Sequence, residues 1–411
     1  MQKWRVKPYN SYYHYKQRKL MIRRASVILI VCLSIITTLI ATKELTLADV
    51  KDLTNKFTLK KNNEPIKETY LEQDQIMYEL YSNPVKVKGI YVPANKMSKL
   101  DELIELADTT EINSFVIDIK NDYGYLTFGT DNAYIQEMGS VSKTPNISDI
   151  EYVMDKVYTA NIYPIARIVT FKDNIVGNTH PDRMIKDKEG NVYKTKDGDM
   201  WLNPYDKRNW EYILEICKEA IALGFKEIQF DYVRFHESMN SERVDLSEDV
   251  SKTEIITEFM AYMYEELKPY GVFVSADVFG AIITSKIDAE IVGQDYKELV
   301  KRLDYISPMV YPSHYEPGSF GIKYPDLQPY DIILKSMQAS TQSIKELERN
   351  ERKAEVRPWL QDFTATWVNP HQTYGKEQIR QQIDGVYDAV LDQWILWNGA
   401  ANYTKEGLEK E

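Results

Sequence analysis

The stretch DKRNWEYILEICKEAIALGFKEIQFDYVRF, residues 206–235, combines an amphipathic helix with a short apolar strand. Asp206 is a residue type that caps helices, and Gly224 is suited to end this helix before the strand at Glu227–Asp231. A helix followed so closely by a short strand is typical of the repeating unit of a parallel β/α fold. This stretch therefore predicts a parallel sheet covered by helices.

The same alternation extends in both directions from this stretch. Seven further apolar runs are predicted as strands, at Val87–Val92, Phe115–Ile119, Ile162–Ile168, Val272–Val278, Asp304–Val310, Val356–Leu360 and Gln393–Trp397. Ser98 is predicted to cap the first helix, with Asp101 three residues on as in a capping box. Eight strands within residues 83–411 predict a (β/α)8 TIM barrel. A doubly wound open sheet is the alternative, but its glycine-rich first turn is missing from PANKMS at residues 93–98.

The N-terminal region is expected to hold the barrel at a membrane. Residues 25–41, ASVILIVCLSIITTLIA, carry no charge and follow a basic tail at residues 1–24. This pattern predicts a transmembrane signal-anchor with the tail in the cytoplasm, followed by a stalk or linker at residues 42–82. A cleaved signal peptide is the alternative, although Leu39 is bulky for the position that precedes cleavage after Ala41. Both interpretations place the barrel outside the cell, and the first predicts a single-pass membrane protein.

Charge and composition exclude several classes of protein. The net charge of −11 combines eight basic and no acidic side chains in residues 1–41 with 43 basic and 62 acidic side chains elsewhere. An exported body with a charge of −19 disfavours nucleic acid as a partner. Two cysteines exclude a disulfide scaffold. The chain has no HExxH, CxxC, P-loop or GxSxG motif, so neither a metal site nor a cofactor is predicted.

Carboxylates occur where four of the predicted strands end. The active sites of TIM barrels lie at the carboxyl ends of the strands. Asp118 and Asp122 lie at or after the end of the second strand, Asp231 ends the fourth, Asp277 lies in the fifth and Asp362 follows the seventh. Because these strand ends surround one mouth of a barrel, we expect the carboxylates to converge there.

A convergent set of carboxyl groups matches the chemistry of glycosidic bond hydrolysis, which uses one acid and one nucleophile or base. Asp231 is predicted as the nucleophile or base and Asp277 as the general acid, with Asp118, Asp122 and Asp362 as rivals and substrate contacts. The other predicted substrate contacts are polar or aromatic side chains near strand ends, namely Arg234, Tyr311, His314, Trp201 and Trp397. Aromatic faces can pack on the apolar faces of sugar rings.

Each of these residues also has a structural interpretation. A strand-end Asp can cap a helix or anchor a loop. Asp277 could face a helix, and the alternation of side chains along a strand could turn Asp118 or Asp122 away from the mouth. Arg234 could simply pair with Glu237. Most of the aromatic side chains are expected to belong to the core.

The strand ends also carry an ordered series of longer motifs. They read VKGIYVPA, FVIDIKNDYG, IYPIARIVTFKD, WLNPYD, EIQFDYVRF, VSADVFG, ISPMVYPSHY, RPWLQDFTA and WILWNGAANY. This series, over about residues 85–405, resembles the "putative glycosyl hydrolase domain" family of bacterial exported and membrane-anchored proteins. The resemblance implies a (β/α)8 fold, glycosidase-type chemistry and the principal catalytic role for Asp231. Better-understood relatives often have Glu on strand five, where this chain has Asp277.

The sequence thus predicts a membrane-anchored extracellular glycoside hydrolase that acts on a cell-wall or surface polysaccharide. One alternative is a non-catalytic glycan-binding or envelope-assembly protein that uses the same barrel. Another is a metal-dependent polysaccharide hydrolase or deacetylase. The acidic body disfavours a strongly anionic substrate unless Lys120, Lys172 and Arg234 offset the field locally.

Overall fold

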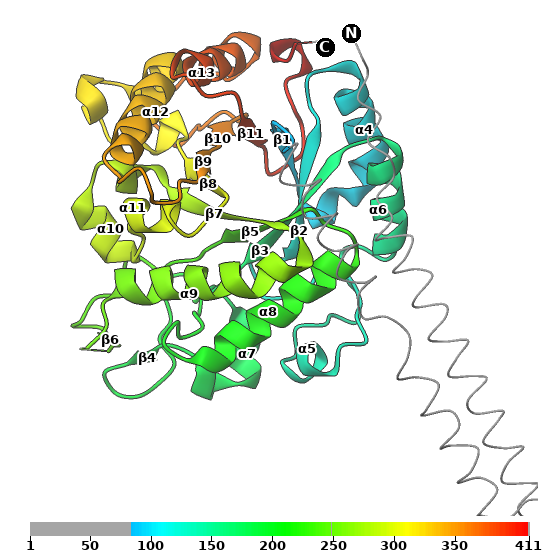
Figure 1. Ribbon diagram of the computed structural model, residues 1–411, viewed down its shortest axis with the longest axis vertical. Helices are drawn as coiled ribbons and strands as arrows, with labels where there is room; N and C mark the ends of the chain where they lie inside the picture. The colour runs from blue at the N-terminus through cyan, green and yellow to red at the C-terminus, as the bar shows by residue number, and fades with distance from the viewer. Residues whose placement is uncertain (1–83, 248, 410–411) are drawn as a thin grey trace, which may run out of the picture. The chain divides into compact units, whose positions relative to one another are not determined.

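The strands of the computed structural model form a closed barrel surrounded by helices (Figure 1). The structure describes residues 84–247 and 249–409. The tail, anchor and stalk predicted for residues 1–24, 25–41 and 42–82 lie outside these ranges. No helix within the described ranges is long and apolar enough to cross a membrane.

The barrel has eight strand positions, and all neighbouring strands are parallel. In order around the ring they are β1 (Lys88–Val92), β2 (Ser114–Lys120), β3 (Tyr163–Val169), β5 (Glu227–Asp231), β7 (Phe273–Phe279), β8 (Tyr305–Met309), the pair β9 (Glu355–Val356) and β10 (Trp359–Gln361), and β11 (Trp394–Trp397). The ring closes because β10 pairs with both β8 and β11, and β11 pairs with β1. Pro358, which has no N–H to donate, separates β9 from β10. All eight predicted strands are confirmed.

Helices cover the outside of the ring (Figure 1). The α-helices are α4 (Leu100–Thr109), α5 (Ala133–Glu137), α6 (Ile150–Thr159), α7 (Asn174–Thr179), α8 (Lys207–Ala222), α9 (Lys252–Leu267), α10 (Lys286–Val292), α11 (Tyr296–Val300), α12 (Pro329–Lys345) and α13 (Lys376–Asp388). A small antiparallel pair, β4 (Lys186–Asp187) and β6 (Val244–Asp245), joins two of the loops.

Of the two predicted helix N-caps, one is confirmed and one is wrong. Asp206 caps α8 by accepting a hydrogen bond from the amide of Arg208, and Gly224 follows the helix with a positive φ of 100°. The cap predicted at Ser98 is wrong, because Ser98 belongs to the 3-10 helix Ala94–Lys99 that precedes α4. Lys99 is the N-cap of α4 and makes no side-chain cap hydrogen bond.

Side chains fill the barrel below its mouth. Glu227 opens β5 at the end of the barrel where the strands begin, and its carboxylate pairs with Arg357, both side chains being fully buried. The hydroxyl of Ser275 donates to the same carboxylate, and the guanidinium lies 4.4 Å from the ring centre of Tyr305. Above this pair, apolar and aromatic side chains form the interior core, namely Val87, Tyr91, Val116, Ile165, Tyr311, Trp359 and Ile395. This packed floor supports the polar groups at the carboxyl ends of the strands.

Candidate active site

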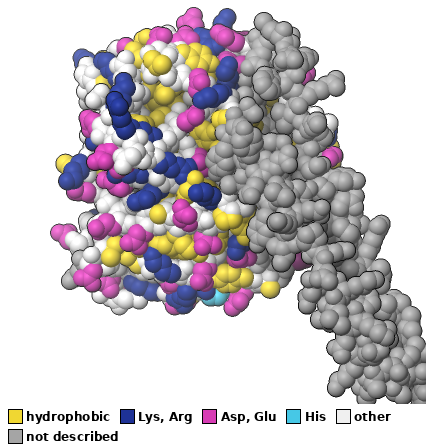
Figure 2. All heavy atoms as spheres, viewed as in Figure 1, with side chains coloured by type: hydrophobic (Ala, Val, Ile, Leu, Met, Phe, Trp, Pro, Cys, Tyr) yellow, Lys and Arg dark blue, Asp and Glu magenta, His cyan; other side chains and the backbone are white. Residues whose placement is uncertain are grey.

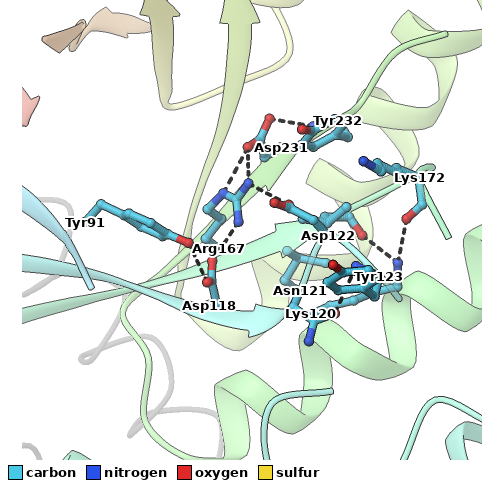
Figure 3. A network of polar contacts seen from close by, with 12 residues as sticks. Tyr91, Asp118, Lys120, Asn121, Asp122, Tyr123, Arg167, Lys172, Asp231 and Tyr232 are labelled. Atoms are coloured by element: carbon cyan, nitrogen blue, oxygen red, sulfur yellow. Dashed lines mark hydrogen bonds and ion pairs between the residues drawn. The ribbon is translucent and has the colours of Figure 1, made fainter. Parts of the chain in front are cut away.

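The guanidinium of Arg167 gathers three of the predicted carboxylates at the mouth (Figure 3). Arg167 lies in β3 and is 1% exposed. Its Nε and Nη2 donate to Oδ2 of Asp231 at 2.9 and 2.6 Å. Its Nη1 lies 2.6 Å from Oδ1 of Asp118, and its Nη2 lies 3.1 Å from Oδ1 of Asp122. The strand ends therefore bring these three carboxylates together around one buried cation.

Arg167 was not among the site residues predicted from the sequence. That prediction considered polar residues at and beyond each strand end, whereas Arg167 lies inside the apolar run IYPIARI. Tyr163 and Ile165 share its face, since side chains alternate along a strand. A lone arginine inside an apolar strand is the signal that could have identified it, because a buried charge requires a partner.

Tyr91 was missed for the same reason. It lies in β1, and its hydroxyl donates to Oδ2 of Asp118 at 2.6 Å. Its ring stacks on that of Trp397, with centres 4.0 Å apart and planes 7° from parallel. The Cζ atom of Arg167 lies 5.5 Å from both ring centres. Trp397, a predicted substrate contact, thus lies beside the carboxylate cluster.

The positive charge of Arg167 is stabilised by the carboxylates around it. Burial lowers the pKa of Arg167, but the charges of Asp231, Asp122 and Asp118 outweigh burial and raise the pKa well above its usual value. The guanidinium therefore remains charged. Burial also raises the pKa of Asp118, against the opposing effects of the Arg167 charge and the Tyr91 hydrogen bond. Three carboxylates around one guanidinium leave the mouth with an excess of negative charge.

The backbone after Asp231 contributes a further donor. Tyr232 has a positive φ of 49°, a conformation rare for a bulky residue and often found at functional sites. In this conformation its amide donates to Oδ1 of Asp231 at 2.6 Å. Arg167 therefore holds one oxygen of the Asp231 carboxylate and the Tyr232 amide holds the other (Figure 3). This arrangement fixes the orientation of the Asp231 carboxylate.

Asp277 lies beside Asp231 on the adjacent strand but in a different environment. Phe230 of β5 pairs with Ala276 of β7. The next residue on each strand is Asp231 or Asp277, so the two acids lie at the same level of the barrel. Asp277 is 1% exposed, and Oδ1 accepts a hydrogen bond of 2.6 Å from the indole of Trp359. Burial and the charge of Asp231 raise the pKa of Asp277 well above its usual range. One acid is thus paired with a cation, while burial raises the pKa of its neighbour.

The pKa of Asp277 leads to a prediction about stability. A carboxyl group whose pKa is raised by folding stabilises the fold below its unfolded pKa, and this contribution is lost as the pH rises through the folded pKa. We therefore expect the melting temperature of Asp277→Asn, relative to the wild type, to increase as the pH rises above about 4, the usual pKa of an unfolded Asp. Thermal unfolding by circular dichroism at a series of pH values measures the difference. A difference independent of pH would contradict the raised pKa of Asp277.

Two other predicted residues lie near the cluster. Tyr311 belongs to the interior core and is 8% exposed, and burial raises its pKa. His314 follows on the same loop, and its ring contacts Tyr311 edge-on at 5.2 Å. Burial lowers the pKa of His314, which favours a neutral imidazole.

Three other predicted residues make structural contacts. Trp201 is 1% exposed and its indole donates to the carbonyl of Arg234, so its ring offers no free face to a sugar. The carboxylate of Asp362 accepts hydrogen bonds of 2.9 and 2.7 Å from the amide and hydroxyl of Thr404. Arg234 lies 3.5 Å from Glu237, and its guanidinium packs over Phe279.

The lysines near the mouth are paired with acids. Lys120 and Asp173 form a fully buried ion pair at 2.9 Å, and Asp173 also caps α7. Lys172 pairs with Asp199 at 2.7 Å. Within the described ranges, no group of three or more His, Cys, Asp or Glu side chains is placed to hold a metal ion. The aspartates of the mouth instead surround a guanidinium.

The comparisons with known proteins agree with this fold. Residues 89–403 match the family described as "Putative glycosyl hydrolase domain". The chain belongs to this family. This glycosyl hydrolase domain contains every residue of the Arg167 cluster, together with Asp277 and Trp359. The resemblance seen in the sequence is confirmed.

Three solved structures are similar to this chain, and the first of them, with a TM-score of 0.56, shares its fold. The PgaB (BpsB) glycoside hydrolase domain from Bordetella bronchiseptica is 13% identical, with a TM-score of 0.56, over 77% of this chain and 95% of that one. A hypothetical protein from Ruminiclostridium thermocellum ATCC 27405 is 35% identical, with a TM-score of 0.42, over 46% of this chain and 97% of that one. The spore cortex-lytic enzyme SleL from Bacillus megaterium QM B1551 is 10% identical, with a TM-score of 0.46, over 79% of this chain and 74% of that one. No curated protein matches the chain.

Proposed function

We propose that the protein is a membrane-anchored extracellular glycoside hydrolase that cleaves a cell-wall or surface polysaccharide. The proposal rests above all on the two neighbouring acids with opposite environments. Asp231 accepts hydrogen bonds from Arg167 and the Tyr232 amide, whereas burial and the charge of Asp231 raise the pKa of Asp277. A carboxyl group with a raised pKa is suited to donate a proton, and a carboxylate paired with a cation is suited to act as nucleophile or base.

The proposed reaction begins with proton transfer from Asp277 to the glycosidic oxygen. The bond from this oxygen to the anomeric carbon breaks, and its electron pair stays with the leaving oxygen. Asp231 then either attacks the positively charged anomeric centre or removes a proton from the water that does so. Arg167 keeps the Asp231 carboxylate in place and balances part of its charge. Trp397, which is partly exposed and stacks on the buried ring of Tyr91, supplies an aromatic surface beside the reacting sugar.

The charges around the site favour an uncharged polymer as the substrate. Lys120 and Lys172 are occupied by Asp173 and Asp199, so neither is free to offset the negative mouth. On the face shown in Figure 2, Lys and Arg side chains alternate with Asp and Glu and form no single basic patch. A strongly anionic chain would therefore be repelled by the mouth.

A digestion panel tests this proposal. The full-length protein in detergent micelles is incubated with peptidoglycan, chitin, cellulose, starch and a poly-N-acetylglucosamine, each with and without a chelator. We expect new reducing ends from at least one uncharged polymer, released equally in both conditions. Binding without new reducing ends would favour the non-catalytic alternative. Activity lost on chelation and restored by a divalent cation would favour the metal-dependent one.

A further inference from the structure

Trp359 is joined to the proposed general acid by a hydrogen bond within the barrel. It lies in β10 and is 1% exposed. Its Nε1 donates to Oδ1 of Asp277 at 2.6 Å, across 82 residues of sequence. The bond is short, and both partners are shielded from water. A single indole N–H therefore contacts the acid at a site where a hydrogen bond is strong.

The position of the indole is fixed by its neighbours. Its ring meets Trp397 edge-on at 5.5 Å and 78°, and Tyr91 edge-on at 6.4 Å and 79°. The backbone of Trp359 is in register with Met309 of β8 and Ile395 of β11. Aromatic packing and strand pairing thus hold the donor in one place. The same two rings lie beside Arg167, which connects Trp359 to the carboxylate cluster.

The hydrogen bond distinguishes the two oxygens of Asp277. An indole N–H can only donate, so Oδ1 must act as an acceptor. Among the described residues, Oδ2 has no hydrogen-bond partner. In a neutral carboxyl group the carbonyl oxygen is the stronger acceptor, so a short bond to Oδ1 favours the proton on Oδ2.

We propose that Trp359 is the positioning residue of the general acid, which holds Oδ1 of Asp277 so that Oδ2 carries and delivers the proton. This inference rests on the proposed function. As the proton moves from Oδ2 to the glycosidic oxygen and the glycosidic bond breaks, Asp277 becomes a carboxylate. The Trp359 hydrogen bond then becomes charge-assisted and stabilises the charge left on the acid.

Removal of this donor is expected to move the titration of Asp277. A hydrogen bond to the charged form lowers the pKa of a carboxyl group, so Trp359→Phe should raise that pKa by about one to two units. The measurement is an infrared titration of the carboxylic acid band in the full-length protein without substrate. Asp277→Asn identifies the band by removing it.

The same shift should appear in the kinetics. A general acid loses activity as the pH rises through its pKa, so the alkaline limb of kcat should move to higher pH in Trp359→Phe. At the optimal pH, kcat should fall about tenfold or more in Trp359→Phe. Without the indole, the Asp277 carboxyl group is no longer held in one orientation, and the carboxylate left after proton transfer loses a hydrogen bond. The substrate is the polymer identified in the digestion panel.

Trp394→Phe provides a matched control. Trp394 lies in the neighbouring strand β11 and is fully buried, and its indole donates to the hydroxyl of Tyr387 at 3.3 Å. Trp394→Phe also removes a buried indole and its hydrogen bond, but this bond is made to Tyr387 and not to Asp277. The infrared band of Asp277 and the alkaline limb of kcat should therefore stay at their wild-type pH. Replacement of Trp359 by 3-benzothienylalanine removes the donor and keeps the shape of the ring. It therefore serves if the phenylalanine variant does not fold.

The outcomes separate this inference from the proposed function. An Asp277 band that titrates at the same pH in the wild type and in the Trp359 variants overturns the inference, whether or not the protein cleaves a glycan. A band that moves while the wild type cleaves no polymer supports the hydrogen bond but overturns both the acid role and the proposed function. A moved band together with a moved alkaline limb supports both.

Discussion

Replacement of Asp231 by Asn is expected to reduce the rate of glycan hydrolysis by a factor of about 10²–10⁴. Asn has the same shape, and its carbonyl oxygen can still accept a hydrogen bond from Arg167 or from the Tyr232 amide. It cannot act as a nucleophile or take a proton from water. Its amide group faces the donor that the lost oxygen served, so the melting temperature should fall, but the protein should stay folded because Asp118 and Asp122 still pair with Arg167. Initial rates of reducing-end release, with a thermal melt of the same preparation, measure both effects.

Asp304→Asn is the control for this prediction. Asp304 precedes β8 at the opposite end of the barrel, where its carboxylate accepts a hydrogen bond from the amide of Val274. The chemical change is the same, but the rate should remain that of the wild type. A rate for Asp231→Asn within a few-fold of the wild type would remove Asp231 from the catalytic role.

Replacement of Arg167 by Met is expected to lower the free energy of unfolding by about 3–5 kcal/mol. Arg167 is 1% exposed and pairs with Asp118, Asp122 and Asp231, so its loss leaves the buried carboxylates of Asp118 and Asp231 without their cation. Urea unfolding at neutral pH measures the loss. Since protonation removes the charge of a carboxylate, the deficit should shrink as the pH falls toward about 4.

Arg167→Lys separates charge from geometry. A lysine keeps the positive charge, but its single ammonium cannot reproduce the fork that contacts three carboxylates. We expect a smaller loss of stability than in Arg167→Met, together with a large loss of activity because the Asp231 carboxylate is no longer fixed. If Arg167→Met were as stable as the wild type, the cluster would not depend on its cation.

The barrel itself could be predicted because its signals are local. Each strand is a short apolar run, and each run is followed by an amphipathic helix, as in residues 206–235. The N-cap residue of a helix is harder to predict, because several residues near the start of a helix can serve as the cap. Ser98 had the expected spacing to Asp101, yet the chain first forms the 3-10 turn Ala94–Lys99.

The convergence of Asp118, Asp122 and Asp231 could also be predicted, since parallel strands end at one mouth. The partners of those carboxylates could not. Arg167, Tyr91 and Trp359 lie inside strands, and the sequence does not show which carboxylates their side chains face. The same limitation applies to Asp362, whose strand-end position does not reveal that its carboxylate binds Thr404.

The amino-acid sequence by itself determined the order of strands and helices and the mouth at which the aspartates meet, because both follow from hydrophobic periodicity and chain direction. Only the tertiary structure decided the different environments of Asp231 and Asp277, on which their proposed roles as base and acid rest. The two side chains are chemically identical until folding places Arg167 on one and buries the other beside Trp359. These contacts join residues from β3, β5, β7 and β10, whose side-chain neighbours are set by the closure of the barrel.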